Sequence, residues 1–142
     1  MPKSSISYLA CIFLIFIALT ISAPLLMWFK TSGIRLYTIT PFYLVQLGLF
    51  IFVGMILGFC DSFIYEMKKS GIWAIDVRKI SILGIPIGVV ACSHLIYFSI
   101  HIPGIIHNIF ANVVNVESGQ VVAAQIILGY VLITSFYKKT AN

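Results

Sequence analysis

The chain has 142 residues, of which 61% are hydrophobic and only 9% are charged, with a mean hydropathy of +1.08 and a formal net charge of +5. Soluble domains carry about 25% charged residues, so this composition excludes a water-exposed surface and predicts a membrane protein. Positive charge in a soluble protein would suggest nucleic-acid binding. Here the basic residues flank apolar runs, and we expect no nucleic-acid partner.

Four apolar runs are long enough to cross a bilayer, whose hydrocarbon core needs roughly 20 helical residues. Because lipid offers no partner to backbone polar groups, each run is predicted to be a helix. The predicted fold is therefore all-α, an integral membrane four-helix bundle in a single domain, 1–142. Its spans are about 7–29, 42–63, 80–100 and 118–137.

The first run could be mistaken for a cleaved signal peptide. Ala23 offers a cleavage site, but Pro24 follows it directly and the apolar run continues to Trp28. Cys11 stands at the start of the run, whereas the cysteine of a lipoprotein follows the apolar stretch. We expect a retained helix.

Glycines spaced by four residues occur in the second and third runs, as "GMILG" and "GIPIG". At 1.5 Å per residue, Gly54 and Gly58 lie at roughly the same depths, 12 and 6 Å, as Gly88 and Gly84. Small residues let helices approach closely, which predicts packing of the second helix on the third within one chain. A homodimer contact and a chance pattern are the alternatives.

Each run places at least one polar side chain in the outer half of the bilayer, at roughly 18 to 24 Å from the inner surface. This predicted polar layer consists of Thr20, Ser22, Gln46, His94 and Gln125. Unpaired polar groups are costly in hydrocarbon, so these side chains are expected to face inward and pair with one another. We favour a structural clasp between helices; a binding or proton-relay layer with His94 as its titratable member is the alternative.

The counts of Lys and Arg on the two sides of the membrane predict the orientation. Seven lie in the two tails and the 64–79 loop, and two lie in the first external loop. Both termini are therefore predicted to be cytoplasmic, in a multi-pass protein of the cell membrane.

Two connections carry additional signals. The segment 64–79 mixes charges of both signs with aromatic and aliphatic residues, and Trp73, Arg78 and Lys79 form a possible docking site for a cytoplasmic partner or anionic lipid. An ordinary positively charged loop is the alternative. Between the third and fourth runs, apolar residues at helical spacing predict a short amphipathic interfacial helix at about 102–114.

Neither metal nor enzyme chemistry is indicated by the sequence. Cys11, Cys60 and Cys92 form no close pair and lie in apolar runs, which predicts small buried side chains rather than disulfides or metal ligands. Depth separates Cys60 from His94, and no nucleophile, nucleotide-binding or zinc-protease motif occurs. We expect no metal, no cofactor and no enzymatic activity.

Small size and few ionisable groups favour a structural or accessory subunit of a membrane complex. Its expected partners are the lipid bilayer and either further copies of itself or another membrane protein. The alternative function is a small oligomeric transporter or channel that uses the polar layer, in particular Gln46, His94 and Gln125.

Overall fold

The computed structural model describes residues 5–35, 40–99 and 119–139, and within them the chain is mostly helical. The helical elements are α1 (Ser5–Arg35), α2 (Thr40–Gly58), the π-helical turn η1 (Phe59–Phe63), α3 (Ile64–Met67), α4 (Val77–Lys79), the π-helical turn η2 (Ile80–Gly84), α5 (Ile85–Ala91), α6 (Ser93–Ser99) and α8 (Gly119–Thr134). The two strands are β1 (Ile72–Ile75) and β2 (Phe136–Lys139). The predicted interfacial helix at 102–114 lies outside the described residues.

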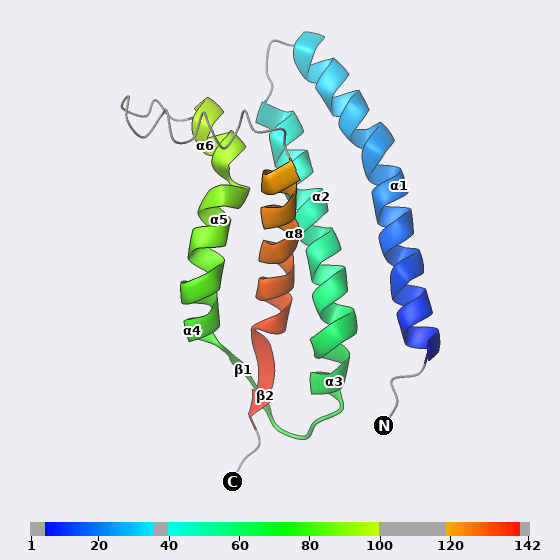
Figure 1. The fold of residues 1–142 in the computed structure, drawn as a ribbon, viewed down its shortest axis with the longest axis vertical. Coiled ribbons are helices and arrows are strands. Elements are labelled where there is room, and N and C mark those ends of the chain that lie inside the picture. Colours follow the sequence, from blue (N-terminus) through cyan, green and yellow to red (C-terminus); the bar gives the residue numbers. More distant parts are fainter. Residues whose placement is uncertain (1–4, 36–39, 100–118, 140–142) are drawn as a thin grey trace.

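Within the described residues the helices form columns that run alternately up and down: first α1, then α2 with η1 and α3, then α4 to α6, and last α8. The start of α1 and the end of β2 therefore lie at the same end of the molecule (Figure 1). The third column is not one helix but a stack of α4, η2, α5 and α6. Two segments, Cys11–Gly33 and Thr40–Ser62, are long and apolar enough to cross a membrane, and Gly119–Thr134 is apolar but shorter.

The α8 helix occupies the centre of the bundle, between α2 on one side and α5 on the other (Figure 1). Its buried positions recur at helical spacing, as an inward face requires, and include Val121, Gln125, Gly129 and Val131. α1 packs against α2 and η1 and leaves most of its surface uncovered. The core is therefore built around α8, the last helix in the chain.

The described residues are mostly helical, as predicted, but two short strands that the sequence analysis did not predict are also present. β1 pairs antiparallel with β2, with Ile72 opposite Lys139 and Ile75 opposite Phe136. The last predicted span ends early for this reason: α8 stops at Thr134, and the chain continues as a strand below the bundle (Figure 1). β-branched and aromatic residues suit strands, but a four-residue pairing between segments separated by 60 residues leaves no local sequence signal.

A disulfide joins Cys11 of α1 to Cys60 of η1, with a Cα–Cα distance of 6.4 Å. The prediction that all three cysteines are unpaired is thus wrong for two of them, while Cys92 carries a free thiol. The sequence could not reveal the pair because its members are 49 residues apart and belong to different helices. The bridge fixes α1 to α2 near the end of the molecule that carries the sheet.

Candidate functional site

Four of the five predicted polar-layer residues are buried in the bundle. Ser22, Gln46, His94 and Gln125 retain 5%, 5%, 6% and 2% of their surface. Thr20 is exposed on α1. Ser93, which the sequence analysis did not include, is fully buried beside His94. Buried polar residues therefore lie among the apolar helices: Gln46 on α2, Ser93 and His94 on α6, and Gln125 on α8. The contribution of α1 is Ser22.

The layer coincides with an interruption of the third column. α5 ends at Ala91 and α6 begins at Ser93, and between them Cys92 departs from helical geometry with φ −90° and ψ 3°. The last carbonyls of a helix have no partner in its own backbone. Here the side-chain amide of Gln125 donates a hydrogen bond of 3.1 Å to the carbonyl oxygen of Ala91, so α8 supplies the missing partner.

Three buried polar atoms around this break have no hydrogen-bond partner among the described residues: Ser93 Oγ, His94 Nδ1 and Gln125 Oε1. Ser93 and His94 directly follow the break, and Gln125 donates a hydrogen bond to Ala91, which precedes it. Buried polar groups in proteins are nearly always satisfied, by protein or by water. The break therefore gathers unsatisfied polar groups that belong to α6 and α8.

The histidine ring is held by an aromatic stack. Tyr43 of α2 stacks on His94 with ring centroids 4.6 Å apart and an interplanar angle of 25°. The Tyr43 ring also stacks on the Phe98 ring, with centroids 5.2 Å apart and an interplanar angle of 10°. Positions 94 and 98 are one helical turn apart, so α6 presents both rings to the same tyrosine. Tyr43 is thus a positioning residue that the sequence analysis missed, although it lies one turn from Gln46.

The expectation that the layer's side chains bond to one another is wrong for three of them. Thr20 and Ser22 donate to carbonyl oxygens of their own helix, those of Phe16 at 2.7 Å and Leu19 at 2.8 Å. Gln125 donates to backbone as well. Because hydroxyl groups in helices readily reach the preceding turn, the polar groups on α1 need no partner on another helix.

The second helix contacts the third through Tyr43, but the predicted packing of their glycine faces on one another is wrong. A Cβ atom on Gly54 would overlap the Ile126 carbonyl of α8, and one on Gly58 would overlap the Ile133 side chain. Gly84 and Gly88 also face α8, but more loosely: a Cβ added at either would lie 3.9 Å from the side chain of Val131 or Leu128, respectively. Both glycine pairs therefore pack within the chain, but against the central helix.

Gly129 of α8 completes this contact and was missed by the sequence analysis. A Cβ on it would overlap the Ile51 carbonyl oxygen and lie 3.0 Å from the Met55 backbone nitrogen. Gly54 and Gly129 thus bring the backbones of α2 and α8 close together from opposite sides. A lone glycine in "ILGYV" lacked the four-residue spacing that drew attention to the others.

The three predicted docking residues have different environments. Lys79 donates to the Thr134 carbonyl at 3.1 Å and to its hydroxyl at 2.7 Å, tying α4 to the end of α8. The Lys138 ammonium lies 5.2 Å from the centre of the Trp73 ring, a cation–π contact across the sheet. Arg78 is exposed to solvent. Two of the three therefore hold the C-terminal segment of the same chain.

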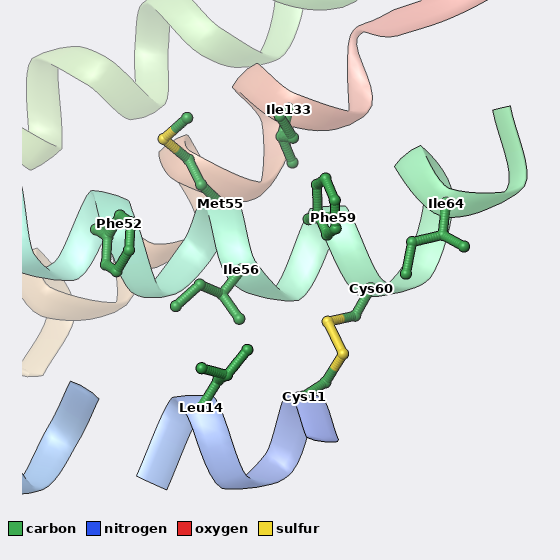
Figure 2. Close-up of a pocket in the computed structure, with 9 residues that line it drawn as sticks. All are labelled: Cys11, Leu14, Phe52, Met55, Ile56, Phe59, Cys60, Ile64 and Ile133. Carbon is green, nitrogen blue, oxygen red and sulfur yellow. A yellow bond between two sulfur atoms is a disulfide. The ribbon is translucent and has the colours of Figure 1, made fainter. Parts of the chain in front are cut away.

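A second feature is an apolar cavity of about 470 Å³ between α1 and α2 (Figure 2). The Cys11–Cys60 disulfide closes one side, and the remaining lining side chains are Leu14, Phe52, Met55, Ile56, Phe59, Ile64 and Ile133. No charged side chain lines it, so the cavity offers hydrophobic contact and no orienting polar group.

Among the described residues, no group of three or more His, Cys, Asp or Glu side chains is placed to hold a metal ion. The buried polar layer is built from Gln, Ser and His side chains. Comparison with protein-family models, with curated proteins and with solved structures found no match.

Proposed function

We propose that this protein crosses the bilayer four times, with both termini cytoplasmic, and serves as a structural or accessory subunit of a membrane complex. Two helices of sufficient length, and the columns that lie alongside them in alternating directions, support the four crossings (Figure 1). The excess of Lys and Arg at the end carrying the sheet supports the orientation. The proposal includes no enzymatic activity.

The observation that carries the accessory role is the exposure of α1. Of the membrane-length window in Cys11–Gly33, only 6% is buried within the chain. Large apolar side chains such as Phe13 and Phe16 retain 61% and 67% of their surface. Lipid alone would satisfy them, but α1 also adds little to the core around α8. A helix that contributes so little to its own fold is well suited to pack against another membrane protein.

The test is native mass spectrometry after gentle extraction of the full chain from its own membrane. We expect a complex containing a second polypeptide, which the variant F13A/F16A on α1 should lose. The matched control is I82A/I85A, which removes exposed apolar side chains from the third column. A homo-oligomeric mass without a second polypeptide, or equal loss with both variants, contradicts the accessory role.

The second candidate function is a small oligomeric transporter or channel. Its support is the helix break with three unpartnered polar atoms, since interrupted helices at membrane depth are common at solute and ion sites in transporters. His94→Leu should then abolish potassium or proton flux into dye-loaded liposomes while assembly survives. A flux that is absent in the parent protein, or unchanged in this variant, excludes this candidate.

A further inference from the structure

The basic residues at the sheet end of the molecule fall into two groups. Three lysines are engaged within the chain: Lys69 with Glu66, Lys79 with Thr134, and Lys138 with the carbonyl oxygens of Met67 at 3.2 Å and Lys69 at 2.8 Å. The other three cations are exposed and have no ion pair or hydrogen bond from their side chains to any described residue: Lys68, Arg78 and Lys139.

The carboxylates at this end are already engaged. Asp76 accepts from the Lys79 backbone N–H at 3.0 Å and caps α4. Glu66 accepts from the Lys138 backbone N–H at 3.0 Å and pairs with Lys69. Asp61 accepts from the Tyr130 hydroxyl at 3.0 Å. The charge of the three exposed cations must therefore be balanced from outside the described chain.

Exposed apolar side chains accompany these cations. Ile72 and Val77 retain 78% and 67% of their surface. Ile72 lies directly opposite Lys139 in the sheet, and Val77 precedes Arg78. The sheet lies just below the apolar columns (Figure 1), where the headgroups of the adjoining leaflet would be if those columns cross a bilayer. Apolar side chains interleaved with cations suit that interface.

We propose that Lys68, Arg78 and Lys139, together with Ile72 and Val77, form a headgroup surface that binds anionic phospholipids of the adjoining leaflet. The cations attract the phosphates, and the aliphatic side chains enter the boundary of the acyl region. The inference rests on the membrane placement proposed above but not on the accessory role. It separates Lys139, which binds lipid, from its neighbour Lys138, which holds the fold.

The experiment titrates the purified full chain in detergent with phosphatidylglycerol or phosphatidylcholine and measures bound lipid by native mass spectrometry. The parent should prefer phosphatidylglycerol. Lys139→Gln should weaken phosphatidylglycerol binding about fivefold, equivalent to about 1 kcal/mol per cation near an anionic surface. The triple variant K68Q/R78Q/K139Q should weaken it roughly 100-fold and leave phosphatidylcholine binding unchanged.

Two controls separate lipid binding from folding. Lys30→Gln removes an exposed cation at the opposite end of the bundle and should leave the preference unchanged. Lys138→Gln should lower the unfolding temperature yet keep the preference. Equal affinity of the parent for both lipids, or an unchanged preference in the triple variant, overturns the inference. Release of the protein from membranes by alkaline carbonate would instead overturn the membrane placement itself.

Discussion

The side-chain nitrogen of Gln125 lies 3.1 Å from the carbonyl oxygen of Ala91, and this hydrogen bond joins the central helix α8 to the end of α5. It is made where the third column is interrupted at Cys92, so a side chain replaces the partner that the next helical turn would supply. The bond therefore stabilises both the contact between two helices and the interruption of one of them. Its loss should have a larger effect than that of an average polar contact.

Gln125→Leu should lower the free energy of unfolding by about 1 to 3 kcal/mol, because it leaves the Ala91 carbonyl buried and unpaired. Gln120→Leu is the matched control, since Gln120 is exposed on the same helix and should change stability by less than about 0.5 kcal/mol. Denaturant titration in a fixed detergent, followed by circular dichroism, measures both. Equal stability of the two variants would show that the bond contributes nothing.

Glycines on α2 should differ sharply in their tolerance of a methyl group. Gly54→Ala places a Cβ against the Ile126 carbonyl and 3.0 Å from the Tyr130 backbone nitrogen, so α2 and α8 must separate. We expect a cost of about 1 to 3 kcal/mol, as for other overpacked contacts. A Cβ atom added at Gly48 would meet no atom of a neighbouring helix within 4 Å, so Gly48→Ala should be neutral or stabilise the helix by up to about 1 kcal/mol. The same denaturant titration compares them, and comparable losses would contradict the observed packing.

The burial of three polar residues could be predicted from the sequence, but the neighbour that each glycine faces could not. Counting residues from the predicted membrane surface brought Gln46, His94 and Gln125 to a similar depth, and the structure buries all three. The same count brought Gly54 and Gly88 to one depth, but both glycines face α8. Depth is fixed by the rise per residue. The choice of neighbour depends on how all the columns pack together.

Features that depend on two distant segments were missed for the same reason. The β1–β2 pairing and the Cys11–Cys60 bridge each join parts of the chain with no spacing motif between them. Thr20 illustrates the opposite error: its depth fitted the polar layer, yet its hydroxyl bonds to Phe16 on its own helix and the residue stays exposed. The four-span topology and the cytoplasmic termini stay predictions.

Acid should loosen the sheet end through Glu66. The Glu66 carboxylate accepts a hydrogen bond from the Lys138 backbone N–H, which has the larger effect, and pairs with the Lys69 ammonium. Together these contacts hold the pKa of Glu66 below its usual value of 4.5. A carboxylate with a lowered pKa in the folded state stabilises that state above its unfolded pKa. The contribution is therefore complete above about pH 4.5 and disappears as the pH falls through the lower folded value.

Amide hydrogen exchange of residues 136–139 as a function of pH, corrected for intrinsic exchange, measures this effect. The parent should lose protection in the acidic range, whereas Glu66→Gln should be less protected at neutral pH and show little further loss on acidification. Parallel acid profiles in the two proteins would show that another group controls the sheet.

The Cys11–Cys60 bridge gives a labelling prediction that also bears on orientation. Of the three cysteines, only Cys92 has a free thiol, so denatured protein should take up one maleimide without reduction and three after it. Cys92→Ser should give no label without reduction and two after it. Three labels on the parent without reduction would contradict the bridge.

The bridge also bears on orientation. Disulfides normally form outside the reducing cytoplasm, whereas the surrounding lysines predict the cytoplasmic side. A C-terminal alkaline phosphatase fusion decides between these arguments. An active fusion reverses the predicted orientation, while an inactive one, in protein that carries the bridge, shows that the sulfurs are shielded from cytosolic reductants at the apolar α1–α2 contact.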